Sequence, residues 1–285
     1  MTDIKIIGDP NPDRINRKYD PNLAHELNKQ TEALIRKEKI KAKLEEKNKV
    51  PIPPTTKIDD SPISPIQNHS DFWTIPGVVY RDEIVTVDLF KYLLDGGNRK
   101  TQDEWILYSI EAKARGDFYT GDMPLHHASF TKAYKMSDSP IKEEIRKFIK
   151  NCMIEHYLAT TTTLFYQPKA LSLEDVIVHN IDMPDKYEIR EYFTLPDEFV
   201  RDSYRPSNYE ALLGSNNLEE IQNVYYWLTD NDPLLYRVNS ILDKIIVAPA
   251  WYDSSDYCVK IGCRSNSPWY ASLGLRITER DSIPF

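Results

Sequence analysis

The chain has 285 residues, of which 41% are hydrophobic, and it carries a formal net charge of −8. A chain of this length can bury a substantial core, as one large domain or two small ones. Its three cysteines are too few and too scattered for a disulfide framework or a zinc ribbon, and its longest uncharged apolar run, 245–252, is too short to span a membrane. We therefore expect a soluble, cytoplasmic protein with no membrane partner.

The charge divides the chain into a basic start and an acidic remainder. Residues 1–49 carry 12 Lys/Arg against 9 Asp/Glu, whereas residues 50–285 carry 24 against 35. An acidic folded part is not drawn to phosphate backbones, so nucleic acid is a candidate partner for the basic arm only. We expect the domain to bind protein. Within the arm, residues 21–48 predict one long helix with a thin apolar stripe, either solvated or bound to a partner.

Three regions follow from composition. Residues 1–49 form the polar basic arm, and residues 50–70 contain five prolines among Thr, Ser and Asp, which is typical of an extended linker. Residues 71–285 are expected to form a single domain of the α+β class. Helix signals dominate 88–160 and strand signals dominate 161–280, so a helical first half should pack on a largely antiparallel sheet.

The domain is expected to begin with strands and short helices. Residues 73–87 predict one or two strands, and Asp88 is expected to cap a short helix that ends at Gly96. Thr101 and Glu104 have the spacing of a capping box, which predicts the start of the next helix.

The central packing element is expected to be a helix capped by Ser139, with Pro140 at its first position. Its apolar face should hold residues spaced three and four apart, and β-branched residues after it predict strands over 160–166 and 175–180. The expected face consists of Ile141, Ile145, Phe148, Cys152, His156 and Ala159.

The C-terminal part is expected to hold two capped helices and then a sheet. Ser207 and Asn217 stand where N-caps are needed, and residues 256–263 and 269–278 alternate between apolar and polar positions. The polar segment 264–268 between these strands predicts a hairpin-like turn.

The segment 116–127 is the most site-like stretch, because glycines, aspartates, aromatic residues and two histidines fall within twelve positions. We expect it to be a polar loop. Asp122, His126 and His127 from this loop, with His179 from a later strand, are the candidate catalytic residues. Neighbouring histidines cannot point the same way, so at most one of the pair can bind a metal directly.

A metal site therefore stays open, with His156 as a further candidate ligand, but no HxH, HExxH or CxxC spacing requires one. No cofactor is indicated. Structural histidines at core edges and turns are the simpler interpretation.

Aromatic residues supply the candidate binding surface. Tyrosine and tryptophan side chains suit protein or sugar recognition, although a ring in the core with its polar tip in water explains them equally well. The binding candidates are Trp251, Tyr252, Trp269 and Tyr270.

Two classes of function remain. The common hydrolase, nucleotide-binding and kinase signatures are missing from the sequence, which favours a non-catalytic interaction or structural protein. The alternative is a small-molecule enzyme, possibly metal-assisted, with the histidine and aspartate site above.

Overall fold

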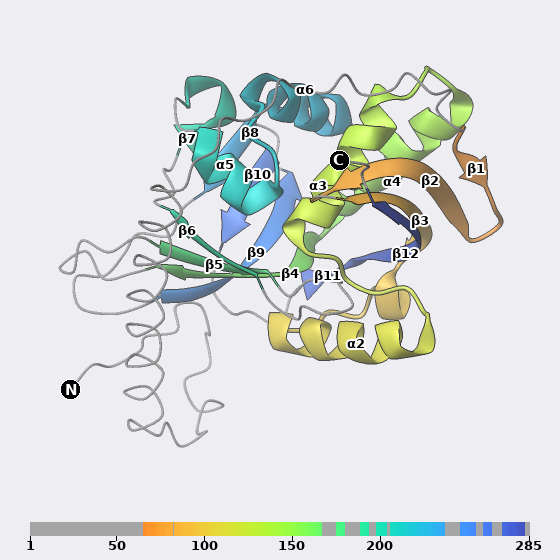
Figure 1. The fold of residues 1–285 in the computed structure, drawn as a ribbon, viewed down its shortest axis with the longest axis horizontal. Coiled ribbons are helices and arrows are strands. Elements are labelled where there is room, and N and C mark those ends of the chain that lie inside the picture. Colours follow the sequence, from red (N-terminus) through yellow and green to blue (C-terminus); the bar gives the residue numbers. More distant parts are fainter. Residues whose placement is uncertain are drawn as a thin grey trace. The chain divides into compact units, whose positions relative to one another are not determined.

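Two β-sheets and the helices packed against them make up the domain (Figure 1). The computed structural model describes residues 65–81, 83–166, 175–179, 189–193, 198–203, 206–236, 246–254, 259–263 and 270–282. Helices and largely antiparallel sheets confirm the predicted α+β class. Among the described residues, no helix combines the length and the apolar composition that crossing a membrane requires.

In chain order, the first part of the domain contains β1 (Gln67–Asn68), β2 (Phe72–Tyr80), β3 (Glu83–Leu93), the 3₁₀ helix η2 (Leu94–Gly97), α2 (Gln102–Arg115), α3 (Met123–Lys135), α4 (Pro140–Glu155) and β4 (Tyr157–Tyr166). The second part contains β5 (Asp175–His179), β6 (Ile189–Phe193), β7 (Glu198–Phe199), η4 (Val200–Asp202), α5 (Pro206–Leu213), α6 (Leu218–Thr229), β8 (Pro233–Tyr236), β9 (Ile246–Ser254), β10 (Val259–Cys263), β11 (Tyr270–Ala271) and β12 (Leu273–Ser282).

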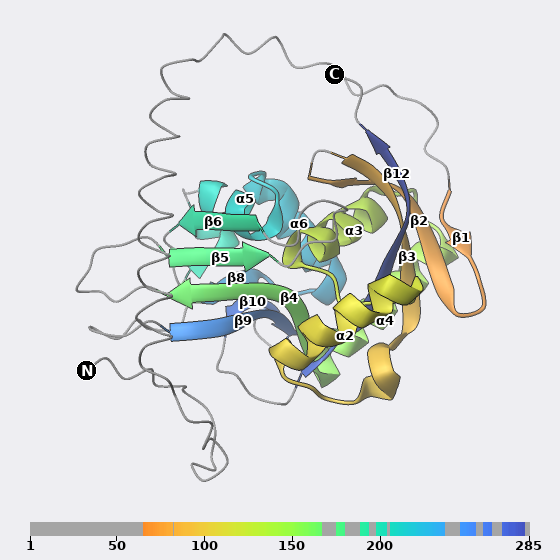
Figure 2. The same cartoon turned by 60° about the horizontal axis from the view of Figure 1, so that its bottom comes forward.

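The smaller sheet has the strand order β1-β2-β3-β12, and all its pairs are antiparallel (Figure 2). One face of this sheet is buried against α3 and α4. Trp73, Ile75 and Val87 from the sheet share one hydrophobic core with Phe130 and Ile149 from the helices. Because side chains alternate along a strand, the residues between these point to the opposite face.

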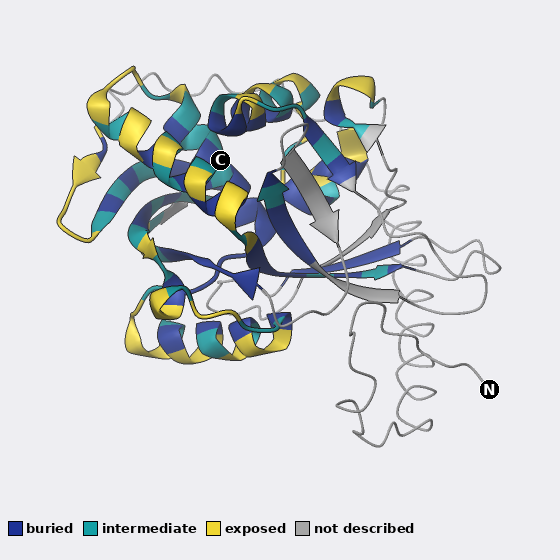
Figure 3. Ribbon diagram, turned by 180° about the vertical axis from the view of Figure 1, so that it is seen from behind, coloured by how far each residue is buried: buried dark blue, intermediate teal, exposed yellow. Residues whose placement is uncertain are grey.

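The larger sheet has the order β6-β5-β4-β9-β10-β8-β7, with β11 paired to β4. It is mixed, since β10 runs parallel to β8 and β11 runs parallel to β4. Trp105 of α2 packs with Trp251 and Tyr270 of the sheet in a second core cluster. Figure 3 shows β4 almost wholly buried and the outer side of α2 exposed.

Three helix starts follow the predicted capping signals, but α5 begins at Pro206, so the predicted cap Ser207 lies inside the helix. Thr101 and Glu104 form the capping box of α2. The Ser139 hydroxyl accepts a hydrogen bond from the backbone N–H of Lys142 at the start of α4, and the Asn217 side chain caps α6 in the same way. The three caps act within the first turn of their helices, which is why they can be recognised from the local sequence.

Two local predictions are wrong. Residues 88–93 continue strand β3 instead of forming a helix capped by Asp88, because they pair with both β2 and β12. The loop expected over 116–127 ends at Asp122, which caps α3, so His126 and His127 lie on a helix.

The larger arrangement also differs from the prediction. The helical first half is not observed, since β1, β2 and β3 precede α2, while α5 and α6 follow β7. The hairpin between 256–263 and 269–278 is also wrong, because β10 pairs within the larger sheet whereas β12 pairs with β3. Non-local pairing decided both outcomes, and periodicity carries no information about it.

The start of the domain lies before residue 71. Ile66 is 7% exposed in the main core, and β1 pairs with β2, although both fall in the range 50–70 that the sequence assigns to a linker. The long helix predicted over 21–48 lies outside the described residues.

The buried face of α4 is centred on Ile149, which is fully buried in the main core. Phe148, which belongs to the expected apolar face, is only half-buried, with its ring centroid 5.6 Å from that of Trp73. The expected face is also too long, because α4 ends at Glu155, so His156 and Ala159 lie beyond the helix. Ile149→Ala is therefore expected to lower the free energy of unfolding by about 2–5 kcal/mol through lost burial and a cavity. Urea unfolding would measure the loss, with the exposed Lys147→Ala as a control that changes stability by less than about 0.5 kcal/mol.

Candidate functional site

Asp122 lies at the centre of the predicted catalytic cluster, and its carboxylate is fully engaged. It is 2% exposed at the N-cap of α3. One oxygen, Oδ1, accepts a hydrogen bond from the backbone N–H of Leu125 at 2.8 Å. The other, Oδ2, accepts hydrogen bonds from the Tyr80 hydroxyl at 2.8 Å and from Arg81 Nη2 at 3.0 Å. The carboxylate therefore joins the end of β2 to the start of α3.

Electrostatics keep this cluster in one protonation state. Burial raises the pKa of Tyr80 well above its ordinary value, and the Asp122 carboxylate adds to the rise. Burial acts to lower the pKa of Arg81, but Asp122 and Tyr80 act in the opposite direction and the net shift is upward. At neutral pH the tyrosine is therefore neutral and the arginine charged, paired with Asp122.

His179 is held by hydrogen bonds on both ring nitrogens. Its Nδ1 lies 2.9 Å from the Thr162 hydroxyl, and its Nε2 lies 2.9 Å from the carbonyl oxygen of Ala211. The Thr162 oxygen also accepts a hydrogen bond from the backbone N–H of Met123 at 2.9 Å. Since the Ala211 carbonyl can only accept, Nε2 carries the proton and Nδ1 accepts from threonine. Burial lowers the pKa of His179 to about 4.

His126 and His127 are both buried but lie in different surroundings. His126 packs against the rings of Phe130 and Tyr252, and neither of its ring nitrogens has a hydrogen-bond partner among the described residues. His127 stacks on Tyr225 with 5.6 Å between ring centroids. Burial lowers the pKa of His126 to about 4 and that of His127 to about 3.

The structure thus brings Asp122, His126 and His179 together around the start of α3, whereas His127 points toward α6. All four side chains are buried, and both ring nitrogens of His179 already have hydrogen-bond partners. Within the described ranges, no group of three His, Cys, Asp or Glu side chains could hold a metal ion. This geometry is that of a structural network. A catalytic role for the four residues stays a prediction.

Three of the predicted aromatic binding residues and the buried Cys152 are placed away from solvent. Trp251, Tyr252 and Tyr270 are at most 3% exposed and pack in the core, and Trp269 lies outside the described residues. Burial raises the pKa of the Cys152 thiol to about 12, so this cysteine is protonated and unreactive at neutral pH.

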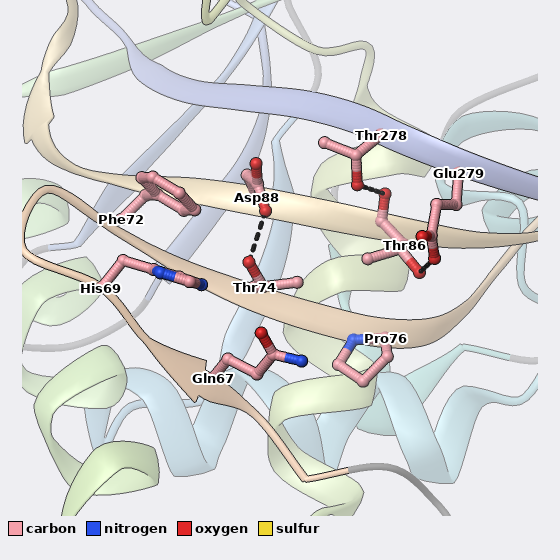
Figure 4. A pocket seen from close by; sticks show the side chains of 9 residues that line it. All are labelled: Gln67, His69, Phe72, Thr74, Pro76, Thr86, Asp88, Thr278 and Glu279. Atoms are coloured by element: carbon pink, nitrogen blue, oxygen red, sulfur yellow. Dashed lines mark hydrogen bonds between the residues drawn. The ribbon is translucent and has the colours of Figure 1, made fainter.

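The solvent-facing side of the smaller sheet carries a hollow of about 400 Å³ that the sequence did not predict (Figure 4). Hydroxyl, amide and carboxylate groups dominate its lining, with an aromatic end and a carboxylate end. We call it the sheet hollow, and it is lined by Gln67, His69, Phe72, Thr74, Pro76, Thr86, Asp88, Thr278 and Glu279.

Two β-bulges shape the sheet hollow at the level of Thr86. In β2, Pro76 and Gly77 together stand opposite Thr86, and Gly77 has a φ of +68° that favours glycine. In β12, Ile277 pairs with Val87 of β3 and Glu279 pairs with the adjacent Thr86. Thr278 is therefore an extra residue relative to β3. A bulge bends its strand and increases the local twist, so bulges on both sides of β3 curve the sheet at this point.

The floor of the sheet hollow includes the buried carboxylate of Asp88, which is paired with the partly exposed Arg276. Asp88 is 3% exposed, and its carboxylate accepts a hydrogen bond from Thr74 Oγ1 at 2.6 Å and from Arg276 Nη2 at 2.7 Å. The guanidinium carbon of Arg276 lies 4.5 Å from the ring centroid of Phe118 and 5.5 Å from that of Phe72. A carboxylate and two aromatic faces therefore hold this cation in place.

Sequence reasoning missed the sheet hollow because it assigned Asp88 to a helix cap. The sequence did contain one indication of this face: Thr74, Thr86 and Thr278 stand at polar positions that alternate with apolar residues in their strands. These positions predict an exposed polar face but not which strands share it.

Comparison with protein-family models, with curated proteins and with solved structures finds no match to this chain. Function is therefore inferred from the geometry of the sheet hollow and of the buried cluster.

Proposed function

We propose that this protein is a non-catalytic binding protein that engages a protein partner through the sheet hollow. The observation that carries this proposal is the pair of bulges at Thr86, which curve one open sheet face around fixed polar groups. β-bulges are common at sheet edges and next to functional sites, where they redirect side chains. In keeping with the few scattered cysteines, we also propose a cytoplasmic location.

Preorganisation supports binding at this face. The Asp88 carboxylate is fixed by Thr74 and Arg276, and the Thr86 hydroxyl is directed to Glu279 at 3.0 Å. Groups that are already ordered lose little conformational entropy when a partner binds. By contrast, the predicted catalytic residues are at most 2% exposed.

The test is a selection of random peptides displayed on phage against the full chain and against Thr86→Trp, which fills the sheet hollow. Peptides selected on the unmodified protein are expected to lose at least about tenfold in affinity for Thr86→Trp, because interface centres contribute most of the binding energy. Leu107→Trp is the matched control, since Leu107 is 62% exposed on α2. Circular dichroism would verify that both variants fold. If no selected peptide depends on Thr86, the proposal is overturned.

A further inference from the structure

Resting on the function proposed above, we propose that the partner presents a basic peptide segment and that Glu279 binds one of its lysine or arginine side chains. The carboxylate end of the sheet hollow, formed by Glu279 and two threonines, is the position of this contact (Figure 4). Glu279 would then be the residue that selects basic partners over others.

The bulge in β12 directs Glu279 to this position. In a regular strand, residue 279 would point to the same side of the sheet as Ile277. The bulge adds Thr278 between them, so Glu279 points to the opposite side. Glu279 therefore pairs with Thr86 and points to the open face. Redirected in this way, the charged side chain does not contribute to the core and is presented at the open face.

Glu279 is exposed and has a hydrogen bond but no cation. The Thr86 hydroxyl donates to Glu279 Oε2 at 3.0 Å. Within the part of the chain that the structure describes, no lysine, arginine or histidine forms an ion pair with this carboxylate, whereas Asp88 beside it is paired with Arg276. The sheet hollow thus holds one neutralised carboxylate and one that is available to a cation.

Arg276 shows how this surface holds a guanidinium group. It combines a carboxylate with the faces of Phe72 and Phe118. The sheet hollow offers an incoming basic segment the same kinds of groups at its two ends, because the Phe72 ring stacks on His69 at the aromatic end and Glu279 lies at the carboxylate end.

Overall charge favours the same partner. Residues 50–285 carry 24 basic against 35 acidic side chains, so the field of this part attracts cationic segments and repels acidic ones. An uncharged sugar would also suit the hydroxyl and amide groups, but it would leave the Glu279 charge without a counter-ion. The basic peptide is therefore the occupant that the chemistry prefers.

The experiment measures fluorescence anisotropy of fluorescein-labelled hexa-arginine with the full chain, and it compares Glu279→Gln with Glu219→Gln. Both variants remove one exposed negative charge, but Glu219 lies on α6. We expect Glu279→Gln to weaken binding about threefold to tenfold, and Glu219→Gln to change it less than about twofold. Peptides that depend on Thr86 in the selection should also be rich in lysine and arginine.

Equal weakening by the two variants would overturn the inference, because it would show attraction by the general field alone. Peptides that depend on Thr86 but lack basic residues would also overturn it, while leaving the proposed binding function intact. Binding of maltohexaose that is lost in Thr86→Trp would replace the peptide with a carbohydrate. A selection without any peptide that depends on Thr86 overturns the proposed function itself.

Discussion

Lowering the pH from 7 to 5 is expected to remove on the order of 5 kcal/mol from the free energy of unfolding. Three buried histidines cause this loss. Burial holds the pKa of His126 and His179 at about 4 and that of His127 at about 3, against an ordinary value of 6.5. A loss of this size is a large fraction of the stability of a typical domain, about 5–15 kcal/mol, so the urea midpoint of unfolding should fall steeply between pH 7 and pH 5.

The direction of this pH dependence follows from the number of protons that the folded and the unfolded chain bind. Above pH 6.5 the histidines are neutral in both the folded and the unfolded chain, and they make stability independent of pH. Below pH 6.5 the unfolded chain takes up protons that the folded chain cannot, so stability falls until the pH reaches the folded pKa values near 4 and 3. The lowered carboxyl pKa values of Asp95 and Asp230 act at lower pH, because their ordinary value is 3.8.

Urea unfolding at intervals of half a pH unit between 7.5 and 5 would measure this dependence. His126→Phe is the sharpest variant, because the ring nitrogens of His126 have no hydrogen-bond partner among the described residues. It should reduce the acid loss by about a third while leaving stability at pH 7.5 within about 1 kcal/mol. A free energy that stays constant down to pH 5 would contradict the burial of these rings.

Asp122→Ala is expected to lower the free energy of unfolding by about 3–5 kcal/mol, because it leaves the buried Arg81 charge without its partner. The same change removes the N-cap of α3 and the acceptor of the Tyr80 hydroxyl. Chemical denaturation would measure the loss. Adding Arg81→Met should recover part of it, since the double variant no longer buries an unpaired charge.

The matched control is Asp138→Ala, which removes an exposed carboxylate paired with Lys142. It is expected to cost less than about 1 kcal/mol. Tyr80→Phe should cost about 1 kcal/mol, the usual contribution of one hydrogen bond. If Asp122→Ala costs no more than Asp138→Ala, the buried ion pair does not stabilise the fold.

How much of this fold can be predicted from the sequence depends on how far apart in the chain the interacting residues lie. Caps such as Ser139 and Asn217 act within three residues, so their sequence signals were sufficient for α4 and α6. The helix α3 was missed because its start, with Pro124 and two histidines, resembles a polar loop. It forms because Asp122 caps it and its buried face packs against β2.

The candidate sites show the same contrast between local signals, which the sequence reveals, and distant contacts, which it does not. The sequence singled out Asp122, His126, His127 and His179 as candidate catalytic residues, but it carried no information about their burial. Asp88 illustrates the reason, because its position in a strand depends on pairing with β12 and its partner Arg276 is 188 residues away. A local pattern cannot distinguish a cap from a strand residue when the deciding contact is that distant.

By itself, the sequence determined the α+β class, the strands that follow α4 and the capped starts of most helices, because periodicity and capping are properties of neighbouring residues. Only the tertiary structure decided that β3 pairs with β12, that two bulges meet at Thr86 and that Glu279 faces the sheet hollow. Thr86 and Glu279 are 193 residues apart. Their meeting depends on the register of strands brought together by folding, and no local preference encodes that register.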